Sequence, residues 1–95
     1  MTGAATHVIY ITERGFEPAV LKVTPGSIVE WVNVDLAEHT TNNATWDSGA
    51  LSAGESYKFQ LTAQGAYTYA DKANPENSGV IIVEGYRLYL PLLLR

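Results

Sequence analysis

The sequence contains no cysteine among its 95 residues. This absence excludes disulfides, thiolate zinc sites, iron–sulfur clusters and every copper site that requires a thiolate ligand. The single methionine is Met1, so no internal thioether ligand is available, and the only histidines are His7 and His39. Few side chains therefore remain that could bind a transition metal or act as a nucleophile.

Basic residues are also scarce. Six Lys and Arg stand against ten Asp and Glu, which gives a net charge of −4. Nucleic acids require a basic stripe and anionic membrane surfaces a basic cluster, so neither partner is expected. No stretch approaches the roughly 20 apolar residues of a membrane-spanning helix. Residues 1–6 have neither the basic nor the apolar region of a signal peptide.

The sequence does contain short segments typical of strands, in most of which apolar and polar residues alternate. These segments cover residues 8–12, 20–23, 28–34, 57–61, 66–70 and 79–84, with a shorter extended piece at 16–18. About seven short strands separated by turn residues predict an antiparallel β-sandwich or a Greek-key barrel. The inward faces are predicted to form the core: Leu21, Val23, Val29, Trp31, Phe59, Leu61, Tyr67, Tyr69, Ile81 and Val83.

A polar stretch, residues 35–50, interrupts the alternation and predicts a long loop. Trp46 lies inside it, and the sequence leaves open whether this side chain caps the core or serves as a surface anchor. Asn43-Ala44-Thr45 matches the acceptor pattern for N-glycosylation. Such short matches arise often by chance, so this one carries little weight.

Several short motifs follow one another in a fixed order along the chain. They are Phe16-x-Pro18, Val23-x-Pro-Gly26, Val29-x-Trp31-x-Asn33-x-Asp35-x-x-x-His39-Thr40, Gly54-x-Ser-Tyr-x-Phe59, Gly65-x-Tyr67-x-Tyr69 and Gly79-x-Ile-x-Val83. No single motif is specific, but the ordered set resembles the cupredoxins of the plastocyanin and amicyanin type over roughly residues 8–84. The resemblance implies an all-β, Greek-key sandwich or barrel of about seven to eight strands, with a domain at residues 1–85.

In cupredoxins a loop histidine, a cysteine, a second histidine and an axial methionine bind copper. The resemblance places the first ligand at His39. Counted from Gly65 and from Pro75, the other three positions fall on Asp71, Asn74 and Asn77. Because a blue copper site depends on a thiolate, the resemblance implies a scaffold that has lost its redox centre.

Two interpretations of these positions remain open. In the first, no metal is bound: Asp71, Asn74 and Asn77 form the loop through bonds to nearby backbone, and His39 is neutral and partly buried. In the second, His39 with Asp71, Asn74 and Asn77 holds a non-blue copper or zinc ion. The first is favoured, because one imidazole and one carboxylate fall short of the three protein ligands of a catalytic zinc site.

The last ten residues, 86–95, form an apolar tail beyond the expected end of the domain. Alternation places Tyr86, Leu88, Leu90, Leu92 and Leu94 on one side, and Pro91 suits an edge strand. An apolar edge left in water would aggregate, so we predict an additional strand that docks on a protein surface. Docking on its own sheet and docking on a second copy are both possible. The second, a homo-oligomer or larger assembly, is favoured.

Enzyme motifs are absent: there is no phosphate-binding glycine loop, no serine-nucleophile motif and no HExxH. The sequence therefore predicts a non-enzymatic, copper-free, cupredoxin-like structural module, extracellular or at the cell surface or in the periplasm, that self-assembles through its tail. The alternatives are a metal-binding cupredoxin with an atypical copper or zinc site centred on His39, and one domain of a larger secreted protein.

Overall fold

A computed structural model describes residues 5–85, in which the alternating segments form seven strands. They are β1 (Thr6–Thr12), β2 (Gly15–Glu17), β3 (Val20–Val23), β4 (Ser27–Asn33), β5 (Ser56–Leu61), β6 (Gly65–Ala70) and β7 (Ser78–Val83). The first and last residues of each strand lie within two residues of the predicted boundaries. The predicted additional strand at 86–95 lies outside the described residues. Nothing within residues 5–85 forms a helix long and apolar enough to cross a membrane.

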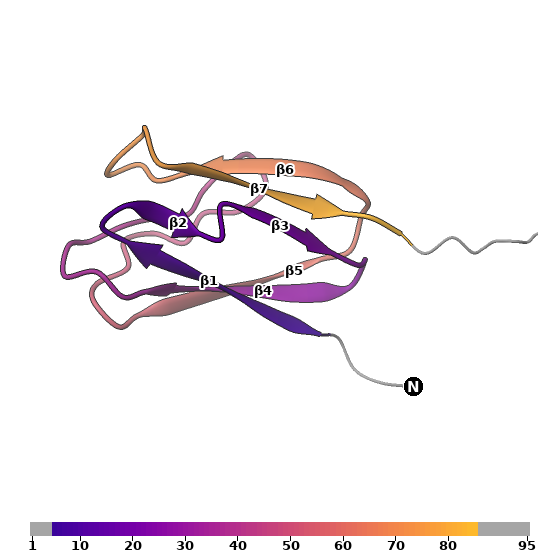
Figure 1. Cartoon of the computed structure of the whole chain (residues 1–95), viewed down its shortest axis with the longest axis horizontal. Coiled ribbons are helices and arrows are strands. Elements are labelled where there is room, and N and C mark those ends of the chain that lie inside the picture. Colours follow the sequence, from indigo (N-terminus) through magenta and orange to yellow (C-terminus); the bar gives the residue numbers. More distant parts are fainter. Residues whose placement is uncertain (1–4, 86–95) are drawn as a thin grey trace, which may run out of the picture.

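The strands form two sheets that face each other as a sandwich (Figure 1). One sheet has the order β2-β1-β4-β5 and the other the order β3-β7-β6, which confirms the all-β sandwich. The expectation of a purely antiparallel sandwich is wrong, because β1 pairs with β4 and β3 pairs with β7 in parallel. Period-two alternation reports which face of a strand is buried but carries no information on strand direction.

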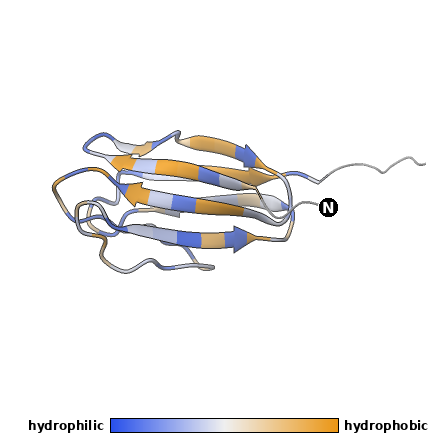
Figure 2. Ribbon diagram, turned by 90° about the horizontal axis from the view of Figure 1, so that it is seen from below, coloured by the Kyte–Doolittle hydropathy of each residue, from blue (hydrophilic) through white to orange (hydrophobic). Residues whose placement is uncertain are grey.

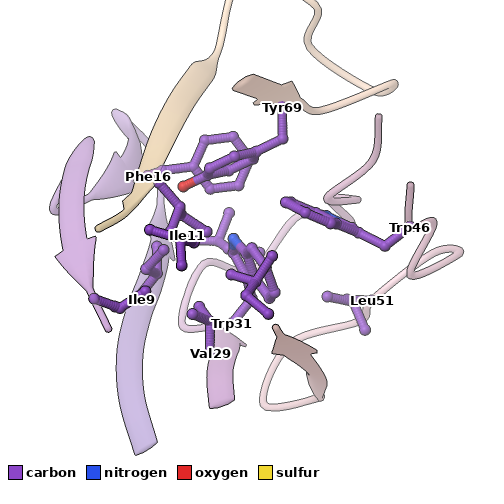
Figure 3. Packing of buried hydrophobic residues seen from close by; sticks show 12 residues of the cluster. Ile9, Ile11, Phe16, Val29, Trp31, Trp46, Leu51 and Tyr69 are labelled. Atoms are coloured by element: carbon purple, nitrogen blue, oxygen red, sulfur yellow. The ribbon is translucent and has the colours of Figure 1, made fainter. Parts of the chain in front are cut away.

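The inner faces of both sheets meet in one hydrophobic core (Figure 3). All ten predicted core residues lie in it or pack against it. Polar and apolar residues alternate along the strands in Figure 2, as expected when only one face of each strand is buried. Trp31 is at the centre, with its ring 5.2 Å from that of Trp46 and 5.5 Å from that of Tyr69.

Five core residues were not predicted: Ile9, Ile11, Phe16, Trp46 and Leu51. Trp46 resolves an open question, because its side chain is only 4% exposed and contacts the rings of Trp31 and Phe59. Its indole N–H donates to Thr41 Oγ1 at 3.0 Å, which satisfies the one polar atom of the buried ring. Trp46 therefore caps the core and is not a surface anchor.

Tyr69 and Gly79 form a close pair across β6 and β7. A Cβ atom at residue 79 would lie 2.4 Å from the Tyr69 hydroxyl oxygen, so only glycine leaves room for the phenol ring. Burial raises the pKa of Tyr69 to about 12. The ring is thus a neutral core residue, and it fixes the two strands that flank the loop at residues 71–77.

Candidate functional site

Asn33, the last residue of β4, organises the loop that follows this strand. Its buried amide nitrogen donates to the carbonyl oxygens of Ala37 at 2.9 Å and Leu51 at 2.8 Å. Its amide oxygen accepts a hydrogen bond from the backbone N–H of Asp35 at 2.9 Å. One side chain therefore fixes both halves of the long loop relative to the end of the sheet.

His39 is held in this loop by its own backbone. Its N–H donates to the carbonyl of Leu51 at 3.1 Å, and the N–H of Leu51 donates back at 2.8 Å. This isolated bridge directs the imidazole inward, where residue 39 is only 2% exposed. The ring orientation is thus fixed by the same loop that closes the end of the sandwich.

The imidazole of His39 lies between two carboxylates. Its Nδ1 is 2.5 Å from Asp71 Oδ2, and its Nε2 is 2.8 Å from Asp35 Oδ2. When both carboxylates are ionised, both ring nitrogens must donate, which requires the imidazolium form. We call Asp35, His39 and Asp71 the Asp–His–Asp cluster. The expectation of a partly buried imidazole is wrong, because residue 39 is only 2% exposed. Each ring nitrogen faces a carboxylate.

Asp71 also forms the loop in which it lies. The residue is completely buried, and its Oδ1 accepts hydrogen bonds from the backbone N–H groups of Thr40 at 3.0 Å and Ala73 at 2.9 Å. Its contact with Ala73 is the local bond to backbone that the loop-forming interpretation predicts. The same carboxylate therefore joins the loop after β6 to the loop after β4.

Asn74 and Asn77 belong to the same loop through their backbone. The N–H of Asn74 donates to the Asp71 carbonyl at 3.1 Å, the N–H of Asn77 to the Asn74 carbonyl at 2.8 Å, and the N–H of Asp71 to the Asn77 carbonyl at 3.2 Å. No hydrogen bond within residues 5–85 joins either amide side chain to His39. The structure thus brings together two of the four candidate ligands, His39 and Asp71, and adds Asp35.

The contacts within the cluster shift the pKa values of His39 and Asp35. Burial by itself lowers the pKa of His39, but the hydrogen bonds and negative charges of Asp35 and Asp71 outweigh it, so the pKa rises above its ordinary value of 6.5. The hydrogen bond from His39 is the largest cause that lowers the pKa of Asp35 below 3.8. Both shifts favour the charged forms of the two side chains.

Stability is expected to depend on pH through this cluster. The contribution of His39 is fully present below pH 6.5 and is lost as the pH rises through its raised folded-state pKa. The contribution of Asp35 is present above pH 3.8 and is lost as the pH falls through its lowered pKa. Urea unfolding from pH 3 to 9 should show both losses, and Asp35→Asn should lower the pKa of His39 measured by NMR. If the His39 titration is the same with and without this substitution, the expected coupling is absent.

The side chains at this end of the sandwich do not suit a blue copper ion. The chain has no thiolate, the only thioether is Met1, and each nitrogen of the only imidazole in the cluster faces a carboxylate. Over the described range, 5–85, no group of three or more His, Asp and Glu side chains is arranged to hold a metal ion. The side chains that meet at this end therefore form an internal network of hydrogen bonds and ion pairs.

The glycosylation pattern at Asn43 has a structural explanation. The Asn43 side chain accepts hydrogen bonds from the backbone N–H groups of Thr45 at 2.8 Å and Trp46 at 2.9 Å. Its amide nitrogen donates to the Thr68 carbonyl at 2.9 Å. Asn43 therefore forms the turn that carries Trp46 into the core, a role that the chance-level sequence match did not reveal.

Comparison with solved structures identifies the fold. A purple cupredoxin from Nitrosopumilus maritimus superposes with a TM-score of 0.79 at 20% identity, over 82% of this chain and 99% of that chain. An oxidized amicyanin variant gives a TM-score of 0.78 at 22% identity, over 82% and 81% of the two chains. A Cu-containing nitrite reductase from Thermus scotoductus gives a TM-score of 0.76 at 24% identity. The match covers 86% of this chain and 22% of that chain.

No protein-family model and no curated protein matches the sequence. The structural neighbours confirm that the fold is cupredoxin-like, as the ordered motifs implied. At these identities the similarity establishes the fold and leaves the function to be argued from the residues of this chain.

Proposed function

We propose that this chain is a copper-free, non-enzymatic cupredoxin-like module with a structural role outside the cytoplasm, at the cell surface, in the periplasm or in an extracellular assembly. The observation that carries the proposal is the Asp–His–Asp cluster. It lies where the resemblance places the copper site, and it uses both nitrogens of His39 for hydrogen bonds to carboxylates. In the proposed module the hydrogen bonds of the cluster join the loop after β4 to the loop after β6. These bonds take the place of bonds to a metal ion.

The chemistry of the cluster supports this role. A metal ion that entered would have to displace a proton from His39 and break a buried hydrogen bond to Asp35 or Asp71. Asp71 would then leave the backbone N–H groups of Thr40 and Ala73 without their acceptor, and unpaired buried donors are costly. The network is complete without a metal.

Burial also supports a non-enzymatic role. Catalytic acids and bases must come within hydrogen-bond distance of a substrate. His39 and Asp71 are both buried, and their polar atoms are used by the protein itself. The cluster therefore serves to fix loops.

The proposed module assembles with further copies through residues 86–95. The support is the alternation that gathers Tyr86, Leu88, Leu90, Leu92 and Leu94 on one side of an extended segment. An apolar surface of this kind needs a protein surface to cover it. Self-association supplies that surface without a second gene product.

Metal dependence tests the copper-free state. If the proposed module holds no ion, EDTA should leave the melting temperature unchanged. One equivalent of copper(II) should give no ordered, stoichiometric EPR signal that depends on His39. The matched variants are His39→Gln and His7→Gln, since residue 7 is the other histidine.

Two outcomes would contradict the copper-free state. One is a fall of many degrees in the melting temperature on chelation. The other is a stoichiometric copper(II) signal that His39→Gln removes and His7→Gln retains, which would favour the atypical metal site.

A further inference from the structure

A groove of about 360 Å³ opens at the end of the sandwich remote from the Asp–His–Asp cluster. Most of the surface that lines the groove belongs to apolar atoms, including the carbon atoms of polar side chains. The lining residues come from the start of β1, the end of β3 and the residue after β7: Ala5, His7, Lys22, Val23, Thr24 and Glu84. The two strands belong to different sheets. The groove is thus an opening between the sheets.

Both strands that line the groove have an edge that no described strand covers. β2 pairs with β1 only over Tyr10–Thr12, so within residues 5–85 the half of β1 at residues 6–9 is paired on the β4 side alone. β3 is the terminal strand of its sheet. Such edges accept an additional strand through main-chain hydrogen bonds.

The apolar tail begins at the mouth of this groove. Glu84 lines the groove, is bonded through its N–H to the Val23 carbonyl at 3.0 Å, and lies two residues before Tyr86. Figure 1 shows that β7 runs toward the end of the molecule at which β1 starts. The acceptor groove and the origin of the tail are therefore at the same end of the sandwich.

The composition of the tail fits the groove. One side of an extended tail is entirely apolar or aromatic, which matches the apolar lining. The tail also has two arginines and no acidic residue, whereas the rest of the chain has ten acidic and four basic residues. Ten extended residues span about 33 Å, and the four unpaired positions of β1 require about 13 Å of that length.

The groove is reached more directly by the tail of a second copy than by the tail of the same chain. β7 points out of the sandwich at this end (Figure 1), so a tail that entered its own groove would have to reverse direction directly after Gly85. The reversal would use several of its ten residues. A tail from a copy placed end to end enters without a reversal.

We propose that two copies meet at this end and exchange residues 86–95 reciprocally, each tail adding a strand between β1 and β3 of the other copy. This inference rests on the proposed assembly function and names its acceptor. Because donor and acceptor lie at one end, a two-fold arrangement satisfies both copies at once. The assembly is therefore a closed dimer and not an open chain.

Light scattering coupled to size-exclusion chromatography tests the exchange on the full chain. The expected mass is twice that of one chain at all concentrations above the dissociation constant. The double variant Leu88→Glu/Leu92→Glu removes the apolar side of the tail, and Ala5→Arg fills the groove from an exposed position. Each should halve the mass while the circular dichroism spectrum stays unchanged. The matched control is Ala53→Arg, at an exposed alanine outside the groove, which should remain dimeric.

Mixing the tail variant with the groove variant tests whether the tail of one copy binds the groove of the other. The tail variant keeps an intact groove and the groove variant keeps an intact tail, so an equimolar mixture of the two monomers should form a dimer through one junction. A dimer that Ala5→Arg leaves intact would overturn the groove as acceptor. Masses that grow beyond the dimer would overturn the closed exchange but keep the proposed assembly. A monomeric parent would overturn both, and the copper-free state would still stand on the EPR result.

Discussion

Replacing Asp71 with alanine is expected to lower the free energy of unfolding by about 3 to 5 kcal/mol, the usual cost of removing one partner from a buried ion pair. The substitution leaves the buried imidazole of His39 without the carboxylate at its Nδ1. It also removes the acceptor of the Thr40 and Ala73 N–H groups. Urea unfolding monitored by tryptophan fluorescence measures the loss.

Two further variants separate the buried ion pair from general effects. Asp71→Asn keeps one oxygen for the two backbone donors and should cost less than alanine. It removes the negative charge and places an amide NH2 group opposite His39 Nδ1. Asp47→Ala removes an exposed carboxylate that lies 2.6 Å from Lys72, and surface pairs of this kind contribute at most about 1 kcal/mol. If Asp71→Ala costs no more than Asp47→Ala, the cluster does not hold the loops.

Replacing Trp46 with alanine is expected to lower the free energy of unfolding by about 3 to 5 kcal/mol, the range for truncating a buried aromatic residue. The indole contacts Trp31, Phe59 and Tyr69, so its loss leaves a cavity at the capped side of the core. It also removes the hydrogen bond to Thr41. Thermal and urea unfolding should both report the change.

The matched control is Leu36→Ala, in the same long loop. Leu36 is 92% exposed, so its truncation should change the stability by no more than about 0.5 kcal/mol. Equal effects of the two substitutions would show that Trp46 is not part of the core in solution. Because Asn43 holds the turn before Trp46, Asn43→Ala should share part of the loss.

The core of the sandwich and the loops that carry the Asp–His–Asp cluster depend on different residues. The sandwich is held by the inner faces of seven strands. The loops at the end that carries the cluster are held by the side chains of Asn33 and Asp71 and by the bridge between His39 and Leu51. At this end the imidazole of His39 faces one carboxylate at each ring nitrogen, and these two carboxylates raise its pKa.

The amino-acid sequence by itself determined the strands, the inward faces of most of them and the lack of a thiolate for a blue copper site. Alternation is a local property, and in segments such as residues 28–34 it states which side chains are buried whatever the rest of the chain does. The absence of cysteine is equally independent of folding. The ordered motifs between Phe16 and Val83 added the fold, which the structural neighbours confirm.

Only the tertiary structure decided which loop residues meet. Asp35 and Asp71 are 36 positions apart in sequence, and no local pattern indicates that both face His39. The same is true of Trp46, whose polar surroundings in the sequence conceal its burial, and of the parallel pairing of β1 with β4. In each case the contact depends on how distant loops or strands pack, and the free energy of such contacts is set by burial and charge pairing that exist only after the sheets have come together.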